Sequence, residues 1–181
     1  GEINISFLNQ LSSKRKWLSP RIGWVTTWNS RCGIATYSKH LTDYFTEYVS
    51  ILAPNEKNLI SADDDTVKRC WSLYPNSNGS LDDLLQEIFI QRLSTVVIQF
   101  NYGFFDFKEL RGFLEALFNH NIKVLITLHS TKDPDNSEDK QLTQLIKVFS
   151  KCDRLLVHSV NDLNCLKGFG LIENTTLFPH G

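Results

Sequence analysis

Short apolar runs alternate along this chain with longer stretches in which apolar and polar residues recur with a helical spacing. The short runs are rich in β-branched residues, which predicts strands that are buried on both faces. The longer stretches repeat apolar side chains every three or four positions, which predicts helices with one buried face. Strands are expected at 22–26, 49–53, 69–73, 95–100, 123–128, 154–157 and 175–178, and helices at 34–48 and from residues 80, 106, 137 and 159 onward.

This alternation predicts an α/β fold: one domain built on a doubly wound, mainly parallel, Rossmann-like sheet. We expect residues 1–20 to form an N-terminal extension and residues 21–181 to form the domain. Ligand-binding groups in such a sheet lie just past the carboxyl ends of the strands, near the point where the strand order reverses. The segments that follow the predicted strands are 27–33, 101–106, 129–136, 158–160 and 179–181.

Polar side chains stand at three predicted helix starts. Ser80 with Asp83 three residues later resembles a capping box. Asp106, followed by Glu109, and Ser159 occupy the same place before the later helices. We expect each to accept a hydrogen bond from a free backbone N–H group of the first helical turn.

Composition narrows the class of protein. The 181 residues are 41% hydrophobic and 22% charged, with 12 Phe and 4 Trp, which excludes general disorder. The net charge of −1 argues against nucleic acid as a partner. The four cysteines show no metal or disulfide spacing, so we expect reduced thiols and a cytoplasmic protein. The basic run 14–16 is expected to be a solvated segment; the alternative is a contact with a polyanion or a peripheral contact with a membrane surface, at its inner face.

The loop after the first predicted strand has no dinucleotide-binding or P-loop glycine pattern. It runs from Asn29 to Gly33, directly before a predicted helix. Free N–H groups at a helix N-terminus can bind a phosphate or carboxylate, and a glycine allows close approach. The alternative is a glycine that serves only the turn.

The residues after the fourth predicted strand combine amides with aromatic rings. Gln99 and Asn101 lie beside Phe100 and Tyr102. Aromatic rings stack on sugars or bases and amides bond their polar groups, so this segment suits recognition of either. The alternative is a buried glutamine within an aromatic packing cluster.

Histidines follow three successive predicted strands. His129, His158 and His180 each stand at a strand exit, where an imidazole can serve as a hydrogen-bonding or acid–base group. A structural role is the alternative for any one of them. The acidic run 63–65 contains a D-x-D pattern, which we interpret as a solvated turn, so no metal site is expected.

Five segments together resemble the N-terminal domain of GT-B glycosyltransferases of the family-4 type. The segments are W-N-S-R-C-G-I-A-T-Y-S at 28–38, Q-F-N-Y-G-F-F at 99–105, T-L-H-S-T at 127–131, L-V-H-S at 156–159 and F-P-H-G at 178–181. The resemblance covers about residues 20–181. It implies the acceptor-side half of a two-domain transferase, a carbohydrate-biosynthesis enzyme, whose C-terminal donor domain lies beyond this sequence.

The resemblance also assigns roles to residues. His129 matches the family's catalytic histidine near the transferred sugar. Cys32 departs from the family, which commonly has a glycine pair in this loop. The implied donor-phosphate and acceptor loop is Asn29, Ser30, Arg31, Cys32 and Gly33; the acceptor side is Asn101, Tyr102, Gly103, Ser130, His158 and Ser159; the hinge is Pro179, His180 and Gly181.

The implied reaction is a hexosyltransferase-like transfer, usually with retention, from a nucleotide-sugar to a glycan, lipid or other acceptor. The implied partners are that donor, a carbohydrate or lipid-linked acceptor and the protein's own C-terminal domain, with no cofactor or metal. This half alone is expected to be inactive. The alternative function is a free-standing, non-catalytic α/β domain that binds a sugar or nucleotide.

Overall fold

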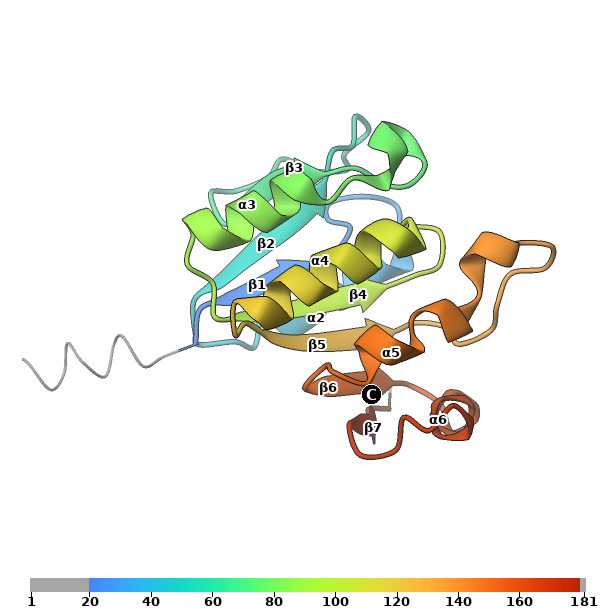
Figure 1. The fold of residues 1–181 in the computed structure, drawn as a ribbon. Helices are drawn as coiled ribbons and strands as arrows, with labels where there is room; N and C mark the ends of the chain where they lie inside the picture. The colour runs from blue at the N-terminus through green and yellow to red at the C-terminus, as the bar shows by residue number, and fades with distance from the viewer. Residues whose placement is uncertain (1–19, 180–181) are drawn as a thin grey trace, which may run out of the picture.

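Seven parallel strands form one sheet in the computed structural model, which describes residues 20–179 (Figure 1). The order across the sheet is β3-β2-β1-β4-β5-β6-β7. The strands are β1 (Ile22–Val25), β2 (Val49–Pro54), β3 (Val67–Trp71), β4 (Thr95–Phe100), β5 (Lys123–Leu128), β6 (Arg154–Val157) and β7 (Thr175–Leu177). The longer helices are α2 (Gly33–Thr42), α3 (Asp82–Ile90), α4 (Phe107–Asn119) and α6 (Val160–Gly168), with a single turn at α5 (Ile146–Phe149).

The strand order reverses once, between β1 and β4. The chain moves outward from β1 to β2 and β3, then returns to pair β4 with the free side of β1. From β4 it moves outward in the other direction to β7. Because all strands are parallel, the loops after β1, β4, β5 and β6 emerge at one edge of the sheet, which we call the carboxyl edge.

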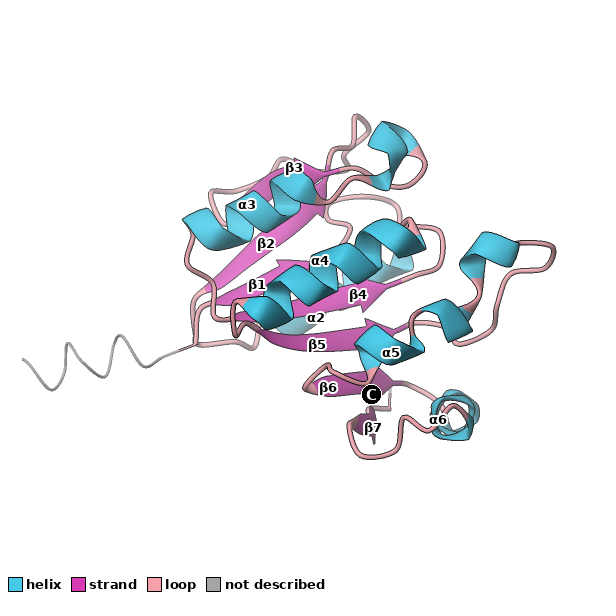
Figure 2. Ribbon diagram, viewed as in Figure 1, coloured by secondary structure: helices cyan, strands magenta, loops and turns pink. Residues whose placement is uncertain are grey.

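Helices cover the two faces of the sheet unequally. Helices α3, α4 and α5 lie on one face, and α2 lies on the other (Figure 2). The larger core is built on the first face, where Leu84, Leu110 and Leu114 are fully buried against the strands. The smaller core, on the α2 face, contains Trp24, Trp28, Ile51 and Val97, with Leu41 packed against it.

Two of the expected helix caps form as the sequence predicts. The Asp106 carboxylate accepts a hydrogen bond from the Glu109 N–H group at 2.9 Å. The Ser159 hydroxyl accepts one from the Asp162 N–H group at 3.1 Å. The capping box at Ser80 does not form, because Leu81 occupies the cap position before α3; the Ser80 hydroxyl still accepts a long hydrogen bond from the Asp82 N–H group, at 3.4 Å.

Two helix predictions need correction. The helix expected over 34–48 ends at Thr42, and Tyr44 is 86% exposed, so its aromatic spacing does not mark a buried face. The helix expected from residue 137 is replaced by two short 3₁₀ turns before α5. There the Asp133 carboxylate accepts a hydrogen bond from the Leu142 N–H group at 2.9 Å, which holds the chain in a loop.

The described part of the chain carries no helix that is both long and apolar enough to cross a bilayer. The N-terminal extension expected over residues 1–20 lies almost entirely outside the described residues, as do His180 and Gly181 of the expected hinge.

Candidate functional site

A layer of polar side chains lies on the α2 face of the sheet, at the carboxyl ends of the central strands. Thr26 directly follows β1, and Gln99 and Thr127 are the next-to-last residues of β4 and β5. All three residues are at least 98% buried. Their neighbours two positions earlier, including Trp24 and Val97, belong to the apolar core on that face. The sheet surface under α2 thus changes from apolar to polar toward the carboxyl edge.

His129 is joined to this layer through Gln99. The His129 Nε2 atom lies 2.7 Å from Gln99 Oε1, and Gln99 Nε2 donates to Thr127 Oγ1 at 3.3 Å. Because the amide nitrogen faces Thr127, its oxygen faces the imidazole and can only accept. His129 therefore donates through Nε2–H, and in its neutral form Nδ1 is the acceptor nitrogen.

His158 has the opposite arrangement at the end of β6. Its Nδ1 atom lies 2.7 Å from the carbonyl oxygen of Phe178, which follows β7. A backbone carbonyl only accepts, so His158 donates through Nδ1–H. In the neutral form of this ring, Nε2 is then the acceptor nitrogen.

Tyr37 of α2 brings the two imidazoles into one cluster. Its ring packs edge-on against His129, with centroids 5.1 Å apart, and against His158, with centroids 5.2 Å apart. The two imidazole centroids are 5.4 Å apart. We call Tyr37, Gln99, His129 and His158 the imidazole cluster. Burial raises the pKa of the Tyr37 hydroxyl to about 12, so the phenol stays protonated at neutral pH.

Hydrogen bonds hold α2 in place over the sheet. The Ser38 and Thr26 hydroxyl oxygens lie 2.7 Å apart, and Trp24 Nε1 donates to Ser38 Oγ at 3.1 Å. Ser38 directly follows Tyr37, so the contact that fixes the helix on β1 also fixes where the phenol ring lies. The geometry of the imidazole cluster is therefore set by the fold.

The loop after β1 is braced from outside the cluster. Asn29 has φ +51°, and its side-chain nitrogen donates to Asp63 Oδ1 at 2.8 Å. Arg69 of β3 binds Asp63 through two hydrogen bonds, of 2.7 and 2.9 Å, and donates to the carbonyl of Trp28 at 3.0 Å. The guanidinium holds the pKa of Asp63 below its usual range, with help from Asn29.

The acidic run at 63–65 is thus not simply a solvated turn, because Asp63 is an ion-pair partner of Arg69. Within residues 20–179, no three His, Cys, Asp or Glu side chains converge as ligands of a metal ion would.

The rest of this loop lies at the N-terminus of α2. Cys32 occupies the cap position, where its sulfur accepts a hydrogen bond from the Thr27 hydroxyl at 3.6 Å. Arg31 and Gly33 are exposed, and a Cβ atom added at Gly33 would meet no atom within 4 Å. Ser30 is buried and lines a small cavity of about 70 Å³ with Asn29 and Lys39.

Most other residues predicted for the site form hydrogen bonds with other residues of the domain. The Tyr102 hydroxyl is buried and donates to Asp133 at 2.9 Å. The Asn101 side chain accepts from the Gly103 N–H group at 2.9 Å, and Ser130 accepts from the Lys132 N–H group at 3.1 Å. Their predicted ligand roles stay predictions, as does that of Pro179, which is exposed at the end of the described chain.

Three features were missed or misread from the sequence. Tyr37 lies in the helix predicted over 34–48 and was given no role in the site. The pairing of Asp63 with Arg69 joins two segments whose contact no local sequence pattern signals. Lys140 is 8% exposed, and its ammonium donates to the Phe105 carbonyl and lies 4.1 Å from the centre of the Tyr74 ring. Burial lowers the pKa of Lys140.

Alkaline pH is expected to destabilise this domain. Burial raises the pKa values of the Cys70 and Cys152 thiols from 9.0 to about 12. Between these values the folded state keeps protons that the unfolded state has lost, so the free energy of unfolding falls as pH rises. Urea unfolding from pH 7 to 11 should show this fall, and Cys152→Ala should make it shallower. A decline as steep as that of the wild type would contradict the assignment to Cys152.

Comparisons with known proteins find little. No family model matches the chain, and no curated protein matches it. Among solved structures, the crystal structure of hydroxymethylglutaryl-CoA lyase from Pseudomonas aeruginosa matches with a TM-score of 0.41 and 12% identity. The match covers 90% of this chain and 69% of the lyase.

These findings contradict the glycosyltransferase assignment. The structural match is to a lyase, an enzyme of another class, and neither sequence comparison supports a GT-B family. The expected membership, the nucleotide-sugar transfer reaction and the place in carbohydrate biosynthesis are therefore withdrawn. A likeness as weak as that to the lyase assigns no activity to this chain either. What stands is an α/β fold with an all-parallel sheet flanked by helices.

Proposed function

We propose that this domain binds a small polar ligand at the carboxyl edge of its sheet, between the ends of β5 and β6 and helix α2. In this proposal the ligand carries hydroxyl or amine groups and lies against the imidazole cluster. The observation that carries the proposal is the fixed orientation of the two imidazoles. Gln99 and the Phe178 carbonyl each accept a hydrogen bond from one ring, which fixes the orientation of both imidazoles at the ends of β5 and β6.

The position of the cluster supports the same proposal. We infer that the sheet belongs to the doubly wound, Rossmann-like class, because its order reverses once between β1 and β4. Ligands of such sheets bind outside the carboxyl ends of the strands, near the reversal. The imidazole cluster begins at β4 through Gln99 and extends over the next two strands.

We further infer that the protein works in the cytoplasm. Its four cysteines are unpaired in the structure, and disulfides are rare in that compartment. A ligand of this site would then be a cytoplasmic metabolite.

Ring-selective NMR tests the proposal. The protein is labelled at its histidine rings and screened against a panel of small polyols, hydroxy acids and amines. A ligand should shift the His129 and His158 ring signals in a saturable way. His129→Ala should weaken its binding about tenfold, or about 1.4 kcal/mol, because the imidazole contact with the ligand is lost.

His120→Ala is the matched control. His120 follows the C-terminal end of α4, where its ring bonds the Ala116 carbonyl at 2.8 Å, and it lies away from the carboxyl edge. This variant should bind as the wild type does. Equal affinities of the His129 and His120 variants would contradict the proposal, as would a panel in which no compound shifts either ring.

A further inference from the structure

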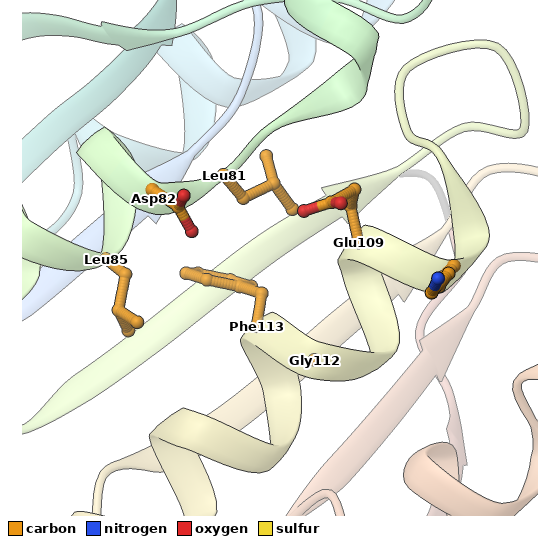
Figure 3. Close-up of a pocket in the computed structure, with 7 residues that line it drawn as sticks. Leu81, Asp82, Leu85, Glu109, Gly112 and Phe113 are labelled. Atoms are coloured by element: carbon orange, nitrogen blue, oxygen red, sulfur yellow. The ribbon is translucent and has the colours of Figure 1, made fainter.

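A groove lies between α3 and α4, on the face of the sheet opposite the imidazole cluster. It has a volume of about 380 Å³, within the range of small-molecule sites. Figure 3 shows the Phe113 ring pointing from α4 toward α3 across its floor. The groove is lined by Leu81, Asp82, Leu85, Lys108, Glu109, Gly112 and Phe113.

The floor of the groove is apolar, and the absence of a side chain at Gly112 leaves the groove unfilled. Leu81 and Phe113 are buried beneath it, and Leu85 is half-buried beside them. Gly112 lies in the interior of α4, where glycine is a poor helix former, and a Cβ atom there would meet no atom within 4 Å. No packing contact therefore requires a glycine at this position, whereas any longer side chain would reduce the groove.

Charge at the groove favours a cation. Asp82 lies on the α3 side and Glu109 on the α4 side (Figure 3). With Lys108, the lining carries two negative charges and one positive charge, a net charge of −1. Neither carboxylate forms an ion pair or a side-chain hydrogen bond with any residue in the range 20–179. Both are thus available to an amine that enters from solvent.

We propose that this groove binds a small organic amine with an apolar, preferably aromatic, body. The ammonium group pairs with Asp82 and Glu109, and the body packs on Phe113 and Leu85. An aromatic body suits the floor because ring pairs add attraction beyond the area they bury. This proposal is independent of the imidazole cluster, since the two sites lie on opposite faces of the sheet.

Titration with 2-phenylethylamine, followed by ¹H–¹⁵N NMR, tests the proposal. The amine should produce saturable shifts in the amides of 81–85 and 108–113, whereas phenylacetate, the anion with the same ring, should produce none. Asp82→Asn combined with Glu109→Gln should weaken amine binding at least fivefold. Equal shifts with the amine and with phenylacetate would overturn the proposal, as would binding of a basic peptide without binding of the amine.

Two substitutions at Gly112 separate filling of the groove from damage to the fold. Gly112→Ala should raise Tm by about 2–4 °C and keep amine binding, because alanine favours the helix and leaves most of the groove open. Gly112→Leu should fill the groove and weaken binding at least tenfold without lowering Tm. If the Leu variant folds and binds 2-phenylethylamine with unchanged affinity, the groove is not the site.

Discussion

Phe100→Ala is expected to lower the free energy of unfolding by about 4 kcal/mol, a large part of the stability of a domain of this size. Phe100 ends β4 and is fully buried. Its ring contacts Tyr102, with centroids 5.3 Å apart, and Phe149, with centroids 5.7 Å apart. Its removal would leave a cavity where β4 meets the carboxyl edge, next to Gln99. Urea unfolding measures the loss directly.

Phe169→Ala provides the control for that experiment. Phe169 follows α6 and is 37% exposed, so the same truncation there should cost less than about 1 kcal/mol. A Phe100 variant no less stable than the Phe169 variant would show that the aromatic packing at the end of β4 does not support the sheet as described.

Arg69→Met is expected to lower the free energy of unfolding by about 2–3 kcal/mol. The change removes both hydrogen bonds to Asp63 and those to the carbonyls of Pro54 and Trp28. It also leaves the Asp63 carboxylate, whose side chain is 22% exposed, without its cation. The amide signals of Asn29 and its neighbours should shift as well, since Asp63 braces that loop.

Lys151→Met is the matched control for the ion pair. Lys151 binds Glu115 at 2.9 Å, but both side chains are well exposed, so their pairing contributes little. We expect a loss below about 0.5 kcal/mol. Similar losses of unfolding free energy in the two variants would mean that the Arg69 interactions stabilise the domain no more than a surface ion pair does.

The sheet could be predicted largely from sequence because its strands carry their own signal. The apolar, β-branched run 95–100 is buried on both faces, and its strand has the expected bounds. The helix predicted over 34–48 was too long because Tyr44 and Tyr48 repeat at a helical spacing but have no apolar surface to pack against. A periodic pattern indicates a helix only where the fold supplies a partner for its face.

The site could be predicted only in part. His129 and His158 were expected after two strands, and the structure places their rings side by side because β5 and β6 are neighbours. The sequence does not show on which face of the sheet the two imidazoles lie, so the packing of Tyr37 against them was not predicted. The family assignment failed because its motifs are short, and glycines, amides and histidines at strand ends are common to many α/β folds.

Gln99 and the Phe178 carbonyl hold the two imidazoles of the cluster in opposite tautomers. Long-range ¹H–¹⁵N NMR of the histidine rings at pH 8 tests it most directly. We expect the Nε2–H form for His129, bonded to Gln99, and the Nδ1–H form for His158, bonded to the Phe178 carbonyl. Tautomers that are averaged at both rings, or the reverse assignment, would contradict it.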